Sequence, residues 1–368
     1  MFGGAYAGRR VFITGHTGFK GSWLSYWLTQ LGAEVTGYAL EPPTVPSLFE
    51  ALTLIDLVHH VVADVRDADR LAAAVCAARP EVVFHLAAQP LVRESYAEPQ
   101  LTFDTNVMGT VNLLEAVRAC DSVAAVVVIT SDKCYRNLED GRPFVEEDAM
   151  GGRDPYSASK GCAELVTAAY AASFFAGDGA AVATARAGNV IGGGDWAADR
   201  IVPDCVRALT ECLPIVVRNP DAVRPWQHVV EPLAGYLLLG GSLLADGHAS
   251  EGAWNFGPAI GEGTLTVRWV VERFIREWGS GSWATPRGGA AQPHEAGYLS
   301  LDSAKAASGL GWAPVLDAPE AVRRTAAWYR GHHEDPRQAR KLTDDDLRAF
   351  SVGAERAWAA SAAHQVKR

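Results

Sequence analysis

Tyr156 and Lys160 stand four residues apart in the segment Tyr-Ser-Ala-Ser-Lys. On a helix this spacing places both side chains on one face, where the lysine ammonium stabilises a tyrosine phenolate and can hold a ribose hydroxyl. A tyrosine that becomes basic near neutral pH is what hydride chemistry at an alcohol carbon requires. The spacing is common by chance, so the prediction depends on the features around it.

Ser131, Asp132 and Lys133 follow directly after the apolar run 124–130. This run is apolar on both faces, which predicts a central strand covered by helices on each side. The carboxyl end of such a strand is where α/β folds place their catalytic groups. We therefore predict Ser131, Asp132, Lys133, Tyr156 and Lys160 as catalytic residues. A surface ion pair is the alternative for Asp132 and Lys133.

A glycine loop with G-x-x-G-x-x-G spacing lies between the predicted strand 10–14 and a helix with an apolar stripe. Glycine permits a tight turn and a close approach of the backbone to a pyrophosphate, and the helix N-terminus favours an anion. In a strand–loop–helix–strand unit this arrangement predicts a dinucleotide site. The predicted contacts are Gly15, Thr17, Gly18, Phe19, Lys20 and Gly21.

Later strand ends supply the other predicted cofactor contacts. Glu41 is the only acid placed to hold an adenosine ribose, and no arginine close to it in sequence would hold a 2′-phosphate, so NAD is preferred and NADP stays open. Asp64 either meets the adenine or caps the next helix. Asn106 is expected to tie its helix to the sheet. The remaining residues predicted at this site are Asp64, Val65, Leu86, Ala87, Ala88 and Asn106.

Short β-rich runs alternate with helical patterns through the first half of the chain, which predicts an α/β fold: a Rossmann-type doubly wound parallel sheet. The expected strands are 10–14, 34–38, 59–63, 82–86, 124–130 and 181–185. From residue 188 Gly, Pro, Trp and Arg become more frequent. We predict an NAD-binding domain over 1–187, a smaller substrate domain mainly over 188–335 with some chain returning to the first domain, and a helical tail over 336–368.

The chain has 368 residues and a formal net charge of −10. The electrostatic field of a negatively charged protein repels nucleic acid and anionic lipid, so neither is an expected partner. No stretch reaches the ~20 apolar residues that span a bilayer. The six cysteines show no zinc spacing, which predicts no metal site and reduced thiols in the cytoplasm.

Five motifs resemble the extended short-chain dehydrogenase/reductase family of nucleotide-sugar enzymes. They are GHTGFKGSW at 15–23, GYALEPPT at 37–44, SDKCY at 131–135, GNVIGGGDW at 188–196 and RPWQHV at 224–229. The resemblance implies a sugar 4,6-dehydratase in which Tyr156 and Ser131 support oxidation of C4, Lys133 removes the C5 proton and Asp132 protonates the leaving C6 hydroxyl.

The resemblance also bears on the substrate. Dehydratases of dTDP- and GDP-sugars carry Glu or an equivalent after the Asp, whereas epimerases lack the acid, so Lys133 favours the branch that acts on CDP-linked glucose. A dehydratase or epimerase for another nucleotide sugar is the alternative. A regulatory protein without catalysis is a further alternative, although it would be expected to lose Tyr156 or Lys160.

The substrate is expected to contact residues in the second half of the chain. Arginines are suited to the diphosphate of a nucleotide sugar, because a guanidinium can form bidentate hydrogen bonds with phosphate oxygens. Arg207 and Arg218 are weaker candidates, and packing competes with binding for the tryptophan and the histidine. The predicted substrate contacts are Asn189, Arg200, Arg224, Trp226 and His228. Helices around 101–120 and 154–175 resemble the family's two-helix seam, which predicts a homodimer.

Overall fold

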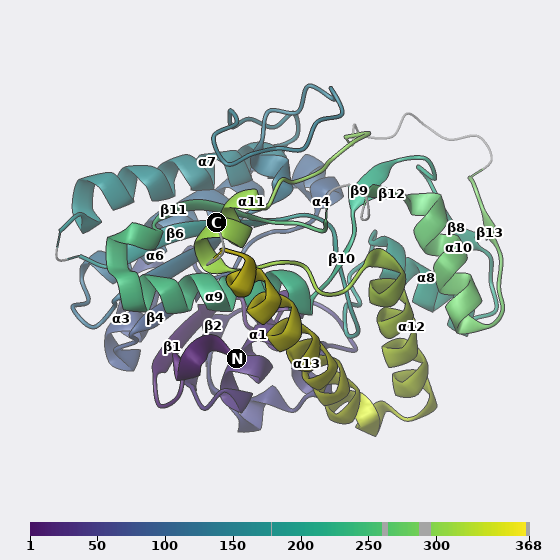
Figure 1. Cartoon of the computed structure of the whole chain (residues 1–368), viewed down its shortest axis with the longest axis horizontal. Coiled ribbons are helices and arrows are strands. Elements are labelled where there is room, and N and C mark those ends of the chain that lie inside the picture. The colour runs from purple at the N-terminus through teal and green to yellow at the C-terminus, as the bar shows by residue number, and fades with distance from the viewer. Residues whose placement is uncertain (178, 260–263, 287–295, 366–368) are drawn as a thin grey trace.

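The computed structural model describes residues 1–177, 179–259, 264–286 and 296–365. A seven-stranded parallel sheet in the order β11-β6-β5-β4-β1-β2-β3 forms its centre (Figure 1). The strands are β1 Arg10–Thr14, β2 Glu34–Ala39, β3 His59–Val62, β4 Val82–His85, β5 Ala125–Ile129, β6 Ala181–Ala187 and β11 Gly252–Phe256. The six predicted strands are confirmed to within one or two residues, and β11 was not predicted.

Helices cover both faces of this sheet and build a smaller part beside it (Figure 1). Their bounds are α1 Phe19–Gln30, α2 Leu48–Ala51, α3 Ala68–Ala78, α4 Val92–Ala97, α5 Pro99–Phe103, α6 Gly109–Arg118, α7 Pro155–Tyr170, α8 Ile201–Thr210, α9 Val230–Asp246, α10 Val267–Trp278, α11 Ala304–Leu310, α12 Ala318–Glu334 and α13 Ala339–Gln365. Short 3₁₀ helices are η1 Phe2–Gly4, η2 Leu54–Asp56, η4 Asp132–Cys134, η6 Gly247–Ser250 and η7 Pro336–Gln338, and π-helical turns are η3 Asp104–Met108 and η5 Ala171–Phe175.

Alternate side chains of the strands enter two separate cores, one on each face of the sheet. Val127 of β5 packs into the core that includes α1 and α9, whereas Val126 and Val128 pack into the core that includes α3 and α6. Burial on both faces explains why this strand is a continuous apolar run in the sequence. The doubly wound α/β architecture predicted from the sequence is confirmed.

The smaller part contains three two-stranded ladders with α8, α10 and α12. Its strands are β7 Val190–Ile191, β8 Ile215–Val216, β9 Val223–Pro225, β10 Gln227–His228, β12 Thr264–Thr266 and β13 Trp283–Ala284. Between β10 and β12 the chain returns to the sheet, since α9 covers it and β11 extends it. The domain boundaries expected from the sequence stay a prediction.

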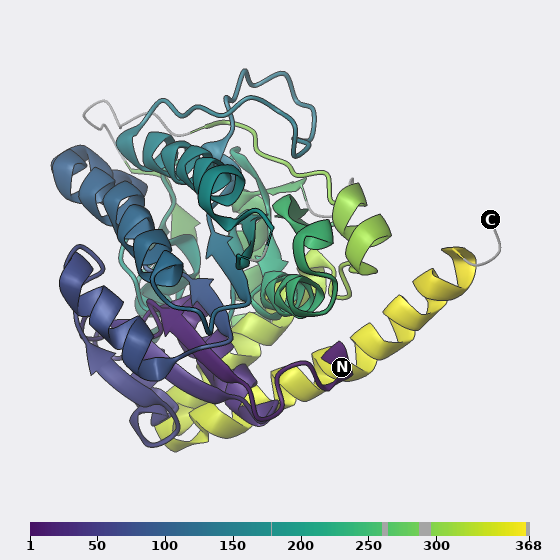
Figure 2. The same ribbon diagram turned by 90° about the vertical axis from the view of Figure 1, so that its left-hand side faces the viewer.

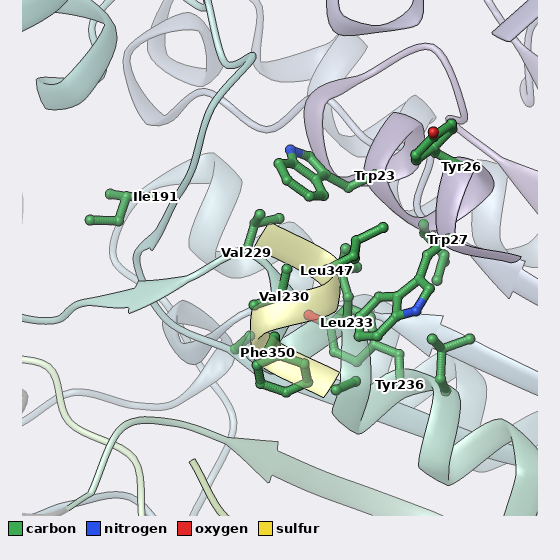
Figure 3. Packing of buried hydrophobic residues seen from close by; sticks show 14 of the residues in the cluster. Trp23, Tyr26, Trp27, Ile191, Val229, Val230, Leu233, Tyr236, Leu347 and Phe350 are labelled. Atoms are coloured by element: carbon green, nitrogen blue, oxygen red, sulfur yellow. The ribbon is translucent and has the colours of Figure 1, made fainter. Parts of the chain in front are cut away.

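The C-terminal helix α13 runs past the body of the molecule beside the N-terminal segment (Figure 2). Its Leu347 and Phe350 pack into the core against Trp27 of α1 and Leu233 of α9 (Figure 3). Helix α13 is thereby joined to the face of the sheet that α1 and α9 cover.

Candidate active site

A cavity of about 660 Å³ opens at the carboxyl ends of the central strands. Its lining includes the loops that follow β1, β4, β5 and β6, together with residues of α8 and of the segment around β8 and β9. Ligands of open α/β sheets bind at this edge, where the order of the strands reverses. Here the reversal lies between β1 and β4.

The glycine loop forms the floor of the cavity at the start of α1. Gly15 has φ of +77°, and a side-chain carbon at this position would lie 2.7 Å from the backbone nitrogen of Ala87. A side-chain carbon at Gly21 would lie 2.1 Å from the carbonyl oxygen of Gly15. Only glycine fits at both positions, and the N-terminus of α1, a helix end that favours anions, faces the cavity. All six predicted loop residues line the cavity.

Lys20 lies inside the cavity rather than at its rim. Its ammonium stands 5.9 Å from the centre of the Tyr236 ring. Burial, followed by the nearby cations Arg200 and Lys160, lowers the pKa of Lys20 to about 7. Near neutral pH this lysine is therefore close to its titration midpoint.

The far end of the cavity contains Asp64, Val65 and Glu41 together with one arginine that the sequence reasoning missed. Arg66 donates hydrogen bonds to Asp64, the shortest at 2.6 Å, and these bonds hold the Asp64 pKa below its usual value. Asp64 does not cap α3, because that cap is Asp67. No arginine lies close to Glu41 in sequence, but the fold brings Arg66 to the same cavity, where its guanidinium already has a carboxylate partner.

Leu86, Ala87 and Ala88 line the cavity, but Asn106 does not. The Asn106 side chain is buried and exchanges hydrogen bonds with the backbone of Gln89, at 2.8 and 3.1 Å. It also donates to the Ser159 hydroxyl at 2.8 Å. Asn106 thus ties the π turn η3 to the loop after β4 and to α7, and it supports the cavity from outside.

Ser131, Lys133, Tyr156 and Lys160 meet in the cavity from two elements, the end of β5 and the start of α7. Asp154 caps α7 by accepting a hydrogen bond from the backbone nitrogen of Ser157 at 2.9 Å. Proline at the first helical position and this cap fix where the helix starts, and hence where Tyr156 stands.

Burial controls the charge of the two α7 groups. It raises the Tyr156 pKa to about 12, while a hydrogen bond with the Ser131 hydroxyl opposes the shift. Burial lowers the Lys160 pKa to about 8, and the nearby Glu164 carboxylate opposes this second shift. The Lys160 ammonium donates to the Ile129 carbonyl at 3.1 Å. Tyr156 is therefore a neutral phenol unless further positive charge enters the cavity.

Asp132 and Lys133 form an ion pair beside these groups. The Lys133 ammonium lies 3.3 Å from Asp132 Oδ1, which also accepts a hydrogen bond from Ser131 at 3.0 Å. Asp132 Oδ2 is buried and has no hydrogen-bond partner among the residues that the structure describes. Gly188 provides the room for this oxygen, because a side-chain carbon there would lie 3.1 Å from Oδ2 and 2.4 Å from Pro225. Sequence reasoning missed Gly188, since its neighbour Pro225 is distant in sequence.

Four of the five predicted substrate residues line the other side of the cavity: Asn189, Arg200, Arg224 and Trp226. Arg200 donates to Asp195 at 2.8 Å, and the Trp226 indole donates to the Leu265 carbonyl at 2.8 Å. Arg218 also lines the cavity, and so does Arg93, which the sequence reasoning missed. Both arginines pair with Asp199, at 2.5 and 3.4 Å.

His228 is not brought to the cavity. It is fully buried, its ring packs against Trp23, and its Nε2 lies 3.7 Å from Asp346 Oδ2 of α13. Burial lowers its pKa to about 3, so the ring is neutral. The prediction that His228 contacts substrate finds no support in this geometry, because the side chain lies between α1 and α13.

No group of three or more histidine, cysteine, aspartate or glutamate side chains is placed to hold a metal ion in the described part of the chain. Within the same ranges, no helix is long and apolar enough to cross a membrane.

Comparison with known proteins places this fold and site among sugar-modifying enzymes. The family model of GDP-mannose 4,6 dehydratase matches residues 12–325, so the chain belongs to this family. The CDP-glucose 4,6-dehydratase of Salmonella typhimurium is 50% identical over 331 residues, which cover 88% of this chain and 91% of the relative.

Solved structures of nucleotide-sugar enzymes have a similar fold. A UDP-glucose 4-epimerase of Thermus thermophilus in complex with NAD has a TM-score of 0.73 at 26% identity, covering 88% of this chain and 99% of that one. The dTDP-glucose 4,6-dehydratase DesIV of Streptomyces venezuelae, a double mutant with NAD bound, has a TM-score of 0.72 at 25% identity over 88% of this chain and 98% of that one.

Proposed function

We propose that this protein converts CDP-D-glucose into CDP-4-keto-6-deoxy-D-glucose, with NAD as cofactor. The observation that carries the proposal is the Asp132–Lys133 ion pair beside a cavity that Ser131, Lys133, Tyr156 and Lys160 line and that the buried Asp132 does not. An epimerase needs only oxidation and reduction at C4, whereas loss of water also needs an acid and a base at C5 and C6. The 50% identity to a CDP-glucose 4,6-dehydratase supports the same reaction and nucleotide.

The glycine loop and the strand ends fit a dinucleotide. Gly15 and Gly21 leave a cradle that any side chain would fill, and Asp64, Val65 and Leu86 to Ala88 continue the same wall of the cavity. When bound, NAD supplies an acceptor for the C4 hydride and later returns that hydride to C6. Lys160 is assigned to a ribose hydroxyl of NAD, and Tyr156 is assigned to the sugar of the substrate.

The first half of the reaction is oxidation of the C4 hydroxyl, which makes C5 the α-carbon of a ketone and therefore acidic. Tyr156 accepts the hydroxyl proton, and Ser131 hydrogen-bonds the same oxygen. With a pKa raised to about 12, Tyr156 needs added positive charge to act as a base. Lys160 would supply this charge when protonated, and NAD would add to it when bound.

The second half is elimination of water. Transfer of one proton from the Lys133 ammonium to Asp132 turns the ion pair into a neutral amine and a carboxylic acid without changing the number of protons. Lys133 then takes the C5 proton, and Asp132 protonates the leaving C6 hydroxyl. Lys133 returns a proton to C5 when C6 is reduced, which leaves the pair one proton short. Ser131 hydrogen-bonds both Asp132 and Tyr156, so the proton that Tyr156 took from the C4 hydroxyl can pass to Asp132 and replace the one lost in water.

Asn189, Arg200, Arg224 and Trp226 are assigned to the nucleotide diphosphate and sugar. Guanidinium groups are suited to phosphate oxygens, and a local cationic wall is required because the chain as a whole carries a formal net charge of −10. His228 is left out of this set because its side chain is in the core.

A homodimer is part of the same proposal. Large apolar side chains are exposed along α4, α5, η3, α7 and η5, and pairing with a second copy would cover them. They are Tyr96, Phe103, Met108, Leu165 and Phe174. All six cysteines are free, which supports a reducing compartment, the cytoplasm.

A substrate panel tests the proposal. The purified protein with NAD is given CDP-, dTDP-, UDP- and GDP-glucose in turn, and products are identified by mass and by proton NMR, which distinguishes C4 epimers of equal mass. We expect a product lighter by one water from CDP-glucose, at a rate at least ~100-fold above the others, which corresponds to ~2.7 kcal/mol of discrimination. A C4 epimer without loss of water would instead identify an epimerase.

A further inference from the structure

The turn that carries Asp132 and Lys133 is held at both of its ends by one buried polar network. Thr130 precedes the turn and Tyr135 follows it. The Thr130 hydroxyl donates a short hydrogen bond to Glu164 of α7. At the other end, the Tyr135 hydroxyl accepts a hydrogen bond from Arg186 of β6 at 2.7 Å.

Glu164 and Arg186 form the centre of this network. Two hydrogen bonds of 2.7 and 2.9 Å join them, and both side chains are 5% exposed. Thr184 donates to the second Glu164 oxygen at 2.7 Å, so both carboxylate oxygens are satisfied. A buried ion pair tolerates its desolvation only when its remaining polar atoms are bonded in this way.

Tyr135 extends the network towards β11 and the loop after η4. Its hydroxyl donates to Asn255 Oδ1 at 2.7 Å, and its ring stacks on Phe144 with 4.7 Å between ring centres. Asn255 in turn donates to the Phe144 carbonyl at 3.0 Å. Arg186 also donates to the Glu146 carbonyl at 3.0 Å. Elements distant in sequence therefore all converge on the Tyr135 side chain.

The two halves of the reaction depend on different supports. Tyr156 is fixed by the Asp154 cap and the start of α7, and Ser131 follows directly from β5. Asp132 and Lys133 lie in a single 3₁₀ turn, which has little rigidity of its own. Outside the turn, the Tyr135 hydroxyl is the polar group through which its far end is bound to the Glu164–Arg186 pair.

We propose that Tyr135 is a positioning residue for the elimination step: through Arg186 and Asn255 it sets where Asp132 and Lys133 stand relative to sugar C5 and C6, and it leaves the C4 oxidation untouched. The inference rests on the proposed dehydration. Displacement of a catalytic group by ~1 Å is enough to slow a step by ~100-fold.

The test compares Tyr135→Phe with Tyr6→Phe in the full-length protein with NAD and CDP-glucose. Tyr135→Phe retains the stack on Phe144 and removes only the hydroxyl. Tyr6 is the matched control, since its buried hydroxyl donates to the Leu237 carbonyl at 2.6 Å and does not line the cavity. Single turnovers are quenched and the sugars are measured by mass, which separates 4-keto-glucose from 4-keto-6-deoxyglucose.

We expect Tyr135→Phe to form 4-keto-glucose at the wild-type rate and to lose water 10- to 100-fold more slowly, so that the undehydrated ketone accumulates, while Tyr6→Phe behaves like the wild type. Equal slowing of both steps, wild-type elimination, or the same change in Tyr6→Phe would overturn the inference. A wild type that forms no 4-keto-6-deoxyglucose would instead refute the proposed function, which keeps the two failures distinct.

Discussion

Two acid–base pairs, linked through Thr130 and Tyr135, differ in how many of their polar atoms are hydrogen-bonded. Glu164 and Arg186 are buried together, and both carboxylate oxygens accept hydrogen bonds. In the second pair, Asp132 is buried and Lys133 is 24% exposed. One 3.3 Å contact joins them, and Asp132 Oδ2 has no partner in the described part of the chain. The first pair lies outside the cavity lining, whereas Lys133 lines the cavity.

The difference in hydrogen bonding suits the two pairs to different roles, one structural and one in proton transfer. A pair with every polar atom bonded resists any change of protonation, because each altered proton would break several hydrogen bonds. A pair with an unsatisfied oxygen next to a cavity can exchange a proton with a substrate at lower cost. The same residue types therefore serve structure in one place and proton transfer in the other.

Removal of the base that faces the reactive pair should have the largest effect. Tyr156→Phe keeps the ring and its burial but cannot accept the C4 proton, so turnover should fall by about 10³-fold or more, or roughly 4 kcal/mol of barrier. Binding of CDP-glucose, followed by calorimetry, should stay within a few-fold of wild type. A variant that retains a tenth of the wild-type rate would remove Tyr156 from its assigned role.

Removal of the Glu164–Arg186 ion pair should mainly lower the stability of the folded protein. Glu164→Gln leaves the buried Arg186 guanidinium without a counter-charge, and such losses cost about 3–5 kcal/mol. We expect a marked fall in the urea midpoint with an unchanged slope. Asp132→Asn is the matched comparison and should lose little stability, since Asp132 already has an unsatisfied oxygen. Equal losses in the two variants would contradict the contrast between the pairs.

In the reactive pair, Asp132→Asn should separate the half-reactions. Oxidation at C4 should proceed, because Tyr156, Lys160 and Ser131 are unchanged, while loss of water should slow by about 100-fold without an acid for the C6 hydroxyl. Reduced cofactor absorbance should then persist during a single turnover. In deuterated water the wild-type product should carry deuterium at C5. An unexchanged C5 hydrogen would rule out Lys133 as a solvent-exchanging base.

How far the sequence predicts these features depends on how local their causes are. The central strands were predicted because two-faced apolar runs are visible in the chain itself, and the glycine loop because its spacing is local. Strand β11 was missed, since Gly-Ala-Trp-Asn-Phe has no clear pattern and pairs with β6 about 70 residues earlier.

At the site, the sequence does not predict which way a side chain points or which residues distant in the chain lie next to it. His228 lies in the motif RPWQHV beside Trp226, yet the two side chains face different surroundings, which only the packing of α1 and α13 decides. Gly188 matters because Pro225 and Asp132 lie on either side of it. Neither relation leaves a trace in local spacing.

A third buried acid sharpens the comparison between satisfied and unsatisfied carboxylates. Glu231 of α9 is fully buried outside the cavity, and one of its oxygens accepts hydrogen bonds from the backbone of Val315 and Leu316, at 3.0 and 2.6 Å. Its other oxygen has no hydrogen-bond partner within the described ranges. Burial raises the Glu231 pKa from 4.5 to about 8, so the folded protein keeps this acid protonated at neutral pH.

The consequence is a pH dependence of stability with a definite sign. Between pH 4.5 and 8 the folded state holds a proton at Glu231 that the unfolded state has released, so this group's contribution to the free energy of unfolding falls as pH rises, by roughly 1.4 kcal/mol per pH unit at most. Glu231→Gln cannot titrate and keeps an acceptor for the two backbone groups. In urea unfolding at pH 5, 6, 7 and 8, the free energy of unfolding of Glu231→Gln should therefore rise relative to that of the wild type with each step. The free energy of unfolding of the exposed control Glu34→Gln should keep a constant difference from that of the wild type. A difference between wild type and Glu231→Gln that stays constant with pH would mean that Glu231 is ionised in the folded protein, and an unsatisfied buried oxygen would then not be enough to hold a proton.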